Sequence, residues 1–343
     1  MSSTSTETSV AIIGAGLSGL TAAHHLLAAS SDSQPPKVLV VDKGRGVGGR
    51  LATRRMGDAN LDHGAQFFTV RTEEFAAAVE GWLSAGVVSE WCRGFSEPDG
   101  YPRYRTEGGM NALAKHLAAE LKGTFGTEIV TRQRASAIIP GPEQWAIAYD
   151  AATREPDEAD ALIATAPVPQ VLELFQAGAT VLDAEVASTL EAMRYHKVIA
   201  ILAVLDRSPG LADPGALQRP DHPVFTFVAD NQAKGISSAP AMTFHLSHGL
   251  SETLYDEDDG AVLAKVESEI RAVIGTAAVS EIQVKRWRYA GPVTPHPEPI
   301  LVAATKPGPL ILAGDGFGTS KVEGAFTSGV AAARQILAGA NRS

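Results

Sequence analysis

Cysteine is nearly absent from this chain of 343 residues, since Cys92 is its single cysteine. An intramolecular disulfide, a cysteine-based zinc site and a dithiol redox pair are therefore excluded. The nine histidines show no H-E-x-x-H or comparable ligand spacing, so we predict no metal site. Any redox chemistry must come from a bound cofactor.

Long apolar runs and an excess of positive charge are also missing. The longest apolar strand-like run, VIAILAVL from Val198, is too short to cross a bilayer. The first residues, MSSTSTETS, have neither the basic start nor the apolar core of a signal peptide. With 29 basic and 39 acidic residues the net charge is −10, which argues against nucleic acid and membrane surfaces as partners. We therefore expect a cytoplasmic protein that acts on a small molecule, and no feature indicates an oligomeric state.

Residues 10–26, VAIIGAGLSGLTAAHHL, predict a strand, a tight turn and a helix. The G-x-G-x-x-G spacing of Gly14, Gly16 and Gly19 suits a pyrophosphate, because it allows the turn, the approach of backbone N–H groups and close helix–strand packing. The helix N-terminus adds unpaired donors. A second strand, KVLVVD, ends about 20 residues further on at Asp42, where a carboxylate can accept hydrogen bonds from a ribose. The sequence therefore predicts a dinucleotide site, with a purely structural turn as the alternative.

Two further segments favour FAD over NAD as the tightly bound nucleotide. Residues 42–50, DKGRGVGGR, combine a flexible backbone around Gly49 with the cationic side chains of Lys43, Arg45 and Arg50. Such a loop suits a pyrophosphate and ribityl chain that run past the first glycine turn. A solvated basic turn is the alternative.

The second segment, LILAGDGFGTSKVEGAFTSG, lies near the end of the chain. Its predicted strand ends at Gly314 and Asp315, which places a carboxylate at the carboxyl edge of the sheet, where ligands of open α/β sheets bind. A final helix follows, opened by the capping-box pattern of Ser320 and Glu323. The positive end of its dipole would stabilise a reduced flavin ring. An ordinary NAD domain does not need this element.

The chain length and the 45% of hydrophobic residues predict a globular protein of about two domains. We expect an α/β fold, with a Rossmann-like FAD-binding domain on a parallel sheet and a second, α+β substrate-binding domain on a mixed or antiparallel sheet. Helices are predicted at 72–83, 108–121 and 260–275, and an antiparallel pair of strands at 128–139 and 145–150. The expected FAD-binding domain comprises residues 1–75, 105–165 and 285–343, and the expected substrate-binding domain comprises residues 76–104 and 166–284.

Taken together, these segments resemble the flavin-dependent amine oxidase superfamily, and most closely its renalase-like branch. The resemblance rests on the opening glycine motif, RGVGGR at 45–50, LDHGAQFFTVR at 61–71, KRWRYA at 285–290 and GDGFGTSKVEGAFTSG at 314–329. It covers essentially the whole chain, because these segments come from both ends and the middle. The glycine loop and the Gly-Asp element are shared by many flavoproteins, whereas DHGAQFFTVR, RWRYA and VEGAFTSG narrow the choice to renalase-like proteins.

The resemblance implies one noncovalently bound FAD. Its pyrophosphate would lie at the glycine motif with Arg50 beside it, its ribityl chain at Asp315 and its adenine at the backbone of Val130. The flavin ring would lie next to DHGAQFF. The candidate cofactor-binding residues are Gly14, Gly16, Gly19, Asp42, Lys43, Arg45, Gly49, Arg50, Gly64, Ala65, Gln66, Val130, Gly314, Asp315, Val322 and Glu323.

The resemblance also implies an oxidase of isomeric dihydronicotinamide dinucleotides. Its substrates would be α-anomers or 2- and 6-dihydro isomers of NAD(P)H, oxidised to β-NAD(P)⁺ by hydride transfer to flavin N5, with O₂ reduced to H₂O₂. A dihydropyridine supplies the electron push from its own ring nitrogen, so no strong general base is needed. The site must then supply orientation, a near-attack distance of about 3 to 3.5 Å and exclusion of water.

His245, in MTFHLSH, is the candidate catalytic residue, because it matches a histidine of renalase-like proteins; a hydrogen-bonded sheet histidine is the alternative. The candidate substrate-binding residues are Arg54, Gln66, Trp287 and Tyr289. A solvent-facing arginine and buried core aromatics are the alternatives here. The chain has Gly316 and Leu250 where renalase-like chains often have tryptophan, so we expect a roomier or differently selective pocket.

Two other functions compete with this hypothesis. An amine oxidase or a desaturase would need an aromatic cage or a wide apolar tunnel, and a chain with 6% aromatic residues gives that little support. A flavin- or nucleotide-binding sensor without catalysis is the non-enzyme alternative.

Overall fold

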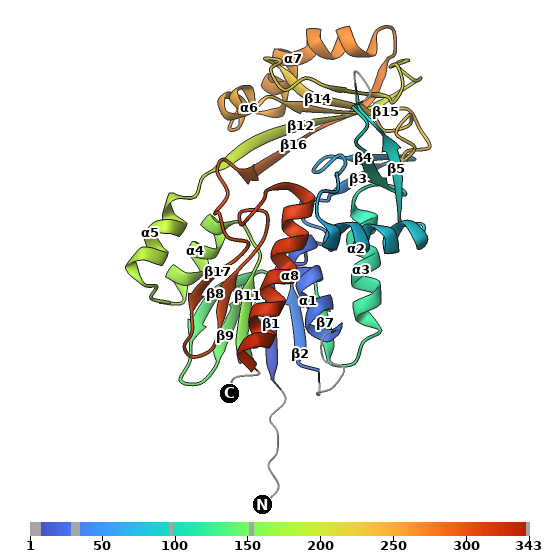
Figure 1. Ribbon diagram of the computed structural model, residues 1–343. Helices are drawn as coiled ribbons and strands as arrows, with labels where there is room; N and C mark the ends of the chain where they lie inside the picture. The colour runs from blue at the N-terminus through green and yellow to red at the C-terminus, as the bar shows by residue number, and fades with distance from the viewer. Residues whose placement is uncertain (1–7, 29–34, 96–98, 151–153, 341–343) are drawn as a thin grey trace, which may run out of the picture. The chain divides into compact units, whose positions relative to one another are not determined.

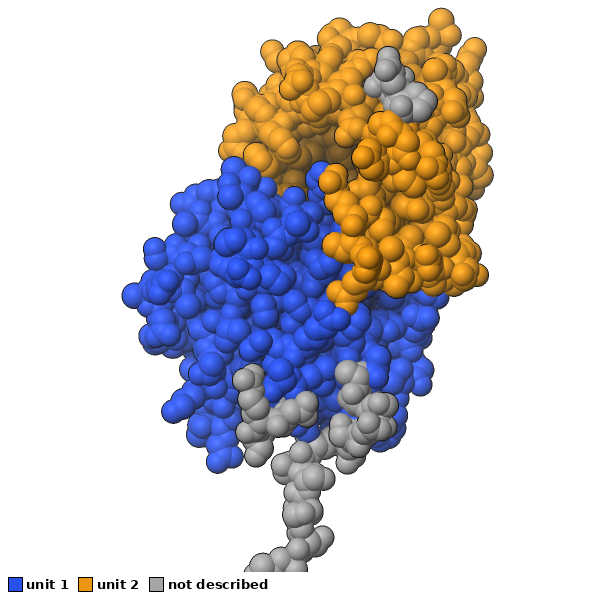
Figure 2. Space-filling model, in the orientation of Figure 1, with its two compact units in different colours: residues 1–49, 114–194, 292–343 blue, residues 50–113, 195–291 orange. Residues whose placement is uncertain are grey.

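The computed structural model divides the chain into two compact units, which Figure 2 shows in different colours. Unit 1 comprises residues 1–49, 114–194 and 292–343, and unit 2 comprises residues 50–113 and 195–291. The structure describes residues 8–28, 35–95, 99–150 and 154–340. The start of the segment that lacks signal-peptide features, residues 1–7, lies outside them. No helix within these described ranges is long and apolar enough to span a membrane.

Unit 1 is built on a six-stranded sheet in the order β17-β18-β11-β1-β2-β7 (Figure 1). Five of its strands run parallel, and β17 pairs antiparallel with β18 at one edge. Most of the strands are apolar runs, as expected for a parallel sheet. They are β1 (Ser9–Ile13), β2 (Lys37–Val41), β7 (Thr127–Val130), β11 (Ala161–Ala164), β17 (Leu301–Ala304) and β18 (Leu310–Leu312).

The first and last helices, α1 (Leu17–Ala28) and α8 (Lys321–Ala340), pack against each other. A Cβ atom at Gly329 of α8 would lie 2.3 Å from the carbonyl oxygen of Ser18 on α1, so the two backbones approach closely only because that position is glycine. In the sheet, β11 alone separates β18 from β1. The first and last helices of the described ranges are therefore neighbours within unit 1.

A small antiparallel sheet completes unit 1, with the order β10-β9-β8. Its strands are β8 (Ala135–Pro140), β9 (Trp145–Tyr149) and β10 (Asp157–Ala159). The predicted single strand at 128–139 is wrong, because its first residues belong to β7 in the parallel sheet. Arg132 separates the two strands: its φ of 60° lies in the left-handed region, and its N–H donates to the carbonyl of Gly44 at 2.7 Å. Unit 1 also contains α4 (Val168–Ala177), α5 (Ala184–Ala192) and most of α3 (Asn111–Lys122).

Unit 2 is built on a five-stranded sheet in the order β13-β14-β15-β12-β16, in which β13, β14, β15 and β12 pair antiparallel in turn. One face carries Phe244 and Val284, which pack with Val266 of α7 in an apolar cluster. The strands are β12 (Tyr195–Leu205), β13 (Ala216–Gln218), β14 (Phe225–Asp230), β15 (Ala241–Leu246) and β16 (Val279–Pro292). Helices α6 (His248–Leu254) and α7 (Asp259–Ile274) follow β15.

The opposite face of that sheet is covered by the hairpin of β3 (Thr53–Met56) and β4 (Ala59–Asp62). Met56 and Leu61 of the hairpin pack there with Leu202 and Ala241. A second hairpin, of β5 (Val88–Cys92) and β6 (Arg103–Thr106), and helix α2 (Glu73–Ser84) complete the unit. The β3–β4 hairpin places residues 62–66, which begin with the last residue of β4, against the sheet, where the Thr243 hydroxyl donates to the carbonyl of Asp62 at 2.9 Å.

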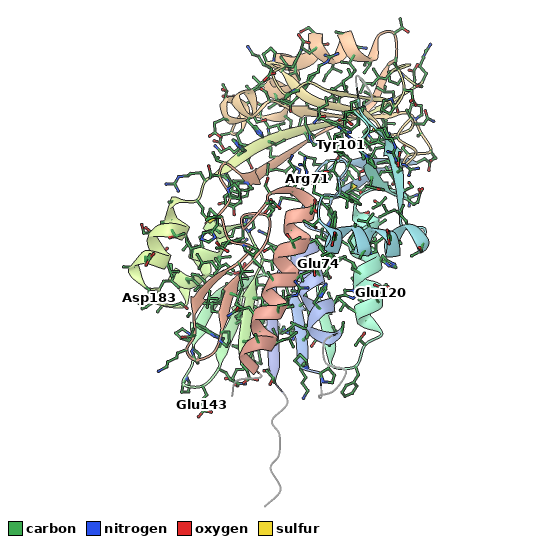
Figure 3. All side chains as sticks on the ribbon, viewed as in Figure 1. Arg71, Glu74, Tyr101, Glu120, Glu143 and Asp183 are labelled. Atoms are coloured by element: carbon green, nitrogen blue, oxygen red, sulfur yellow. The ribbon has the colours of Figure 1, made fainter. Side chains whose placement is uncertain are left out.

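The predicted helices are confirmed as α2, α3 and α7. Helix α2 begins where the sequence indicates, because the Thr72 hydroxyl accepts from the Phe75 N–H at 3.3 Å. Glu73 and Glu74 lie in its first turn, at the positive end of the helix; Figure 3 labels Glu74. The predicted α/β fold class, with a parallel Rossmann-like sheet and a second antiparallel sheet, is also confirmed.

The unit boundaries differ from the domain boundaries expected from the sequence. Residues 50–75 lie in unit 2, because the β3–β4 hairpin shares an apolar cluster with its sheet. Residues 166–194 lie in unit 1, where the Thr180 hydroxyl donates to the carbonyl of Ile138 at 2.6 Å. A Cβ atom at Gly178 would lie 1.8 Å from the same carbonyl oxygen, so this segment packs tightly on β8.

Candidate functional site

The turn after β1 contains three glycines, and each of them is glycine for a different physical reason. Gly14 has a φ of 112°, in the left-handed region, and a Cβ atom there would lie 2.4 Å from Thr165 Oγ1. A Cβ atom at Gly19 would lie 2.0 Å from the carbonyl oxygen of Gly14, so α1 can pack this closely only with glycine. At Gly16 a Cβ atom would meet nothing within 4 Å. The packing of the protein therefore does not require glycine at Gly16, and the open space at the N-terminus of α1 fits an anionic group.

The second glycine-rich turn lies directly beside the first. Gly16 and Gly48 form an isolated parallel bridge, and the Gly48 N–H donates to the carbonyl of Ala15 at 2.8 Å. Gly49 has a φ of 52°, and a Cβ atom there would lie 3.6 Å from the Cα of Gly16. The two glycine-rich turns thus border the same open space at Gly16.

Asp42 ties the two turns together. Its Oδ2 accepts from the Ala15 N–H at 2.7 Å and its Oδ1 from the Gly44 N–H at 2.6 Å. Because a carboxylate offers about four acceptor positions, both oxygens can still accept from a hydroxyl donor. The Asp42 N–H donates to the carbonyl of Val130 at 2.8 Å, so Val130 lies at the same edge of the sheet.

The cationic residues of the second turn do not all face this space. The Lys43 ammonium donates to Gln170 Oε1 on α4 at 2.9 Å, and the Arg45 side chain is exposed. Arg50, at the start of unit 2, donates from Nη1 to the carbonyl of Tyr289 at 3.2 Å.

The loop that follows β18 also lies at the carboxyl edge of the parallel sheet. Gly314 follows β18 with a φ of 126°, and its N–H donates to the buried hydroxyl of Ser328 on α8 at 2.7 Å. Asp315 comes next, and the first turn of α8 carries buried Val322 and half-buried Glu323. The structure therefore brings both glycine turns, Asp42, Val130 and Asp315 to the carboxyl edge of one sheet. This donor set, with the open space at Gly16, fits a dinucleotide cofactor.

In unit 2, residues 62–66, here called the DHGAQ segment, form a tight loop that begins at the last residue of β4. A Cβ atom at Gly64 would lie 2.0 Å from the carbonyl oxygen of Arg50, and the Ala65 N–H donates to the same oxygen at 2.8 Å. The Gln66 amide donates from Nε2 to the carbonyls of Asp62 at 2.7 Å and Gly64 at 3.2 Å. These two bonds fix Gln66 Oε1, which is buried and has no hydrogen-bond partner among the described residues.

The sheet of unit 2 presents a second set of candidates on the face opposite α7. Side chains alternate along a strand, so His245 lies opposite Phe244, and Lys285, Trp287 and Tyr289 lie opposite Val284. The Trp287 ring stacks on His63 of the DHGAQ segment, with ring centroids 5.2 Å apart and an angle of 21° between planes.

Two hydrogen-bonding contacts join this face to the DHGAQ segment. Trp287 Nε1 donates to the carbonyl of His63 at 2.7 Å, and His245 Nε2 lies 3.4 Å from Gln66 Nε2. The predicted residues His245, Gln66 and Trp287 therefore meet on one surface of unit 2.

Arg54 reaches this surface from the hairpin. It is paired with Leu61, which packs toward the sheet, so its side chain lies on the sheet side, whereas Arg55 lies on the exposed side. Arg54 Nε is buried and has no partner among the residues that the structure describes. Leu250, in contrast, packs against the α7 cluster.

The charged groups that act on this surface of unit 2 are mainly positive. The pKa of His63 is lowered to about 4, mainly by burial and then by the Lys285 and Arg54 cations. The pKa of His245 is also lowered to about 4, mainly by burial and then by His63. Both imidazoles are therefore neutral at pH 7. The nearby Asp62 carboxylate does not offset the cations, because the buried Lys234 ammonium pairs with it at 2.7 Å.

These pKa values predict an acid-sensitive stability. The two histidines have pKa values of about 4 in the folded protein and near 6.5 in the unfolded chain. Between about pH 4 and pH 6.5 the unfolded chain therefore binds more protons than the folded protein. The free energy of unfolding is therefore expected to fall as the pH drops from about 6.5 to about 4, by up to about 1.4 kcal/mol per pH unit for each histidine. Urea unfolding across this range measures the slope. The His63→Gln/His245→Gln variant should show a flatter slope, and an unchanged slope would contradict the assignment.

Sequence reasoning missed two residues of this surface. Lys285 stands within the KRWRYA segment, and its alternation with Trp287 is a signal that identifies it. Lys234 stands in the polar stretch NQAKG, where no local pattern distinguishes it from a solvated lysine. Within the described ranges, no group of three or more His, Cys, Asp or Glu residues lies where it can hold a metal ion.

Comparison with known families supports the pairing of a Rossmann-like domain with a flavin enzyme. The family described as "Flavin containing amine oxidoreductase" matches residues 81–337. The family described as "NAD(P)-binding Rossmann-like domain" matches residues 12–79, which include both glycine turns. Renalase from Mus musculus is 21% identical over 344 aligned positions, which cover 93% of this chain and 96% of that protein.

Solved structures show the same fold. A putative protoporphyrinogen oxidase from Exiguobacterium sp. 255-15 superposes with a TM-score of 0.73 at 14% identity, covering 98% of this chain and 99% of that chain. Putrescine oxidase bound to putrescine has a TM-score of 0.71 at 15% identity, covering 97% of this chain and 99% of that chain. At these identities the likeness concerns the fold alone.

Proposed function

The chain belongs to the flavin-containing amine oxidoreductase family, and from this premise we propose that it is a FAD-dependent oxidase of isomeric dihydronicotinamide dinucleotides. The products are β-NAD(P)⁺ and H₂O₂, formed at the expense of O₂. The 21% identity to renalase over nearly the whole chain supports this choice within the family.

The proposed cofactor is noncovalently bound FAD, which when bound supplies the two-electron oxidising power of the reaction. In unit 1, the backbone around Gly16 and Gly49 would hold the pyrophosphate, Asp42 a ribose and Asp315 the ribityl chain. Val130 is proposed for the adenine. In unit 2, the DHGAQ segment would contact the flavin ring through Gly64, Ala65 and the fixed acceptor Gln66 Oε1.

The observation that carries the proposed substrate class is the positive, aromatic surface of unit 2. Arg54 and Lys285 lower the pKa of His63, and Trp287 stacks on that ring. A dinucleotide brings phosphates and flat rings, which such a surface attracts and stacks. A diamine such as putrescine brings two positive charges, which the same cations repel. The surface therefore favours a dinucleotide over a cationic amine.

The protein residues in this proposal orient the substrate and exclude water. A dihydropyridine expels hydride with help from its own nitrogen, so the low pKa of His245 suits a neutral hydrogen-bonding contact rather than a strong base. Arg54 and Lys285 would bind phosphate, and the His63–Trp287 stack would support a ring. Tyr289 borders the same face, with its ring 5.6 Å from Tyr195.

Anaerobic rapid mixing tests the proposal. Bleaching of the oxidised flavin band by 2- or 6-dihydro isomers of NAD(P)H, followed by H₂O₂ release on admitting air, is the expected result. Bleaching by putrescine alone would indicate an amine oxidase instead, and no bleaching by either compound would indicate a nucleotide-binding sensor.

Charge removal gives a graded test of the substrate class. The Arg54→Gln variant is expected to raise the KM for an isomeric dinucleotide about tenfold, the size of one charge-assisted hydrogen bond. Steady-state oxygen consumption measures this. Arg55→Gln is the matched control, because Arg55 is the next residue and lies on the exposed side of the hairpin. Equal KM values for the two variants would contradict the role given to Arg54.

A further inference from the structure

Lys234 is a fully buried lysine in the turn between β14 and β15, with 0% of its side chain exposed. Its ammonium donates to Asp62 Oδ2 at 2.7 Å and to the carbonyl oxygen of Gln66 at 2.5 Å. Asp62 and Gln66 are the first and last residues of the DHGAQ segment. One ammonium group therefore holds both ends of this loop.

Asp62 is fixed from every side. Its Oδ1 accepts from the Thr53 hydroxyl at 2.6 Å and from the Met110 N–H at 2.8 Å. Its backbone carbonyl accepts from Gln66 Nε2 at 2.7 Å and from the Thr243 hydroxyl at 2.9 Å. The loop is thus anchored on β3, on the start of α3 and on β15.

A buried ion pair of this kind is not explained by stability alone. Withdrawing two charges from water costs as much as the pair regains, and apolar side chains of similar volume often serve equally well. The pKa of Lys234 is lowered, because burial lowers it more than the Asp62 carboxylate raises it. The Trp91 ring, 5.0 Å from the Lys234 nitrogen, adds a cation–π contact. We therefore look for the role of the ion pair in the position of the DHGAQ segment that it holds.

We infer that Lys234 is a positioning residue, which holds Gln66 so that its side-chain oxygen accepts a hydrogen bond from an N–H group of a bound ligand. The amide cannot turn over, because rotation would put Oε1 against the carbonyl oxygens of Asp62 and Gly64. The donor is an imide or carboxamide N–H. Both a flavin ring and a nicotinamide carry such a group, so this inference rests on the proposed function for its choice of ligand.

The test uses the full-length flavoprotein and three variants. Lys234→Met/Asp62→Asn removes the ammonium without leaving an unpaired buried carboxylate, and Gln66→Met removes the acceptor itself. Lys265→Met, at an exposed position of α7, is the control for losing a lysine. Amide hydrogen exchange of residues 63–66, the absorption spectrum and midpoint potential of the flavin, and KM against kcat are the readouts.

In the Lys234→Met/Asp62→Asn variant the amides of residues 63–66 are expected to exchange faster than in the wild type, while those of α7 do not change. If the donor is the flavin, this variant and Gln66→Met both shift the flavin spectrum and potential before any substrate is added. If the donor is the substrate, both keep the spectrum and raise KM roughly 10- to 100-fold with a smaller effect on kcat.

The inference is overturned if the double variant keeps wild-type exchange at residues 63–66. It is also overturned if both variants keep the spectrum, the potential and the KM of the wild type. Failure of the proposed function looks different, because isomeric dinucleotides would then not reduce even the wild-type protein. Amide exchange and the flavin potential would still decide the role of Lys234.

Discussion

Replacing Lys234 with methionine is expected to lower the free energy of unfolding by about 3 to 5 kcal/mol, the usual result of removing one member of a buried ion pair. Both side chains of the Lys234–Asp62 pair are 0% exposed, and their charged atoms lie 2.7 Å apart. The Lys234→Met variant leaves the Asp62 carboxylate charged and buried without its counter-ion. Urea or guanidinium unfolding at neutral pH measures the loss.

Two comparisons separate this effect from a loss of packing. Lys265→Met changes an exposed lysine on α7 and should stay within about 0.5 kcal/mol of the wild type. Lys234→Met/Asp62→Asn removes both charges and should be more stable than Lys234→Met alone, because no unpaired charge is buried. If Lys234→Met lowers the free energy of unfolding by less than about 1 kcal/mol, the expectation is contradicted, because a charged Asp62 left buried without its counter-ion would cost more than that.

The second large effect concerns the glycine turn. Gly16→Ala is expected to weaken FAD binding about 5- to 150-fold, which corresponds to an overpacking cost of about 1 to 3 kcal/mol at the cofactor. The new methyl group meets nothing within 4 Å in the protein, so the unfolding free energy of the apoprotein should not change. Titration of apoprotein with FAD, followed by flavin fluorescence, measures the dissociation constant.

Two other glycines supply the controls for Gly16→Ala. Gly81→Ala on α2 also places a methyl group in open space, and it should leave FAD affinity unchanged. Gly19→Ala should destabilise even the apoprotein, because its methyl group would lie 2.0 Å from the carbonyl oxygen of Gly14. If Gly16→Ala binds FAD as tightly as Gly81→Ala, the pyrophosphate does not lie at this turn.

The parts of the fold that were predictable depend on neighbours in sequence. The strand, turn and helix around Gly14 follow from a short apolar run and from glycine spacing, and α2 follows from Thr72 and the carboxylates after it. The strand expected at 128–139 was wrong because its alternation continues across Arg132, where the turn is made with Gly44, far back in the chain.

Residues of the candidate site could be predicted where they belong to a sequence motif. They could not be predicted where only tertiary packing brings them to the site. His245, Gln66 and Trp287 came from recognisable segments, and the structure brings them onto one surface of unit 2. Lys234 has no such segment, and its partner Asp62 stands 172 positions away. Only the pairing of β14 and β15 next to the β3–β4 hairpin brings these two charges together.

The order of the segments in unit 1 constrains how the chain matures on the ribosome. The glycine turn is synthesised before β18 and α8, which complete its sheet and pack on α1. A nascent chain therefore exposes the apolar side of α1 until α8 has been synthesised. Premature termination before residue 310 would leave a dinucleotide motif that cannot close its own sheet, and such truncated chains should be insoluble or degraded.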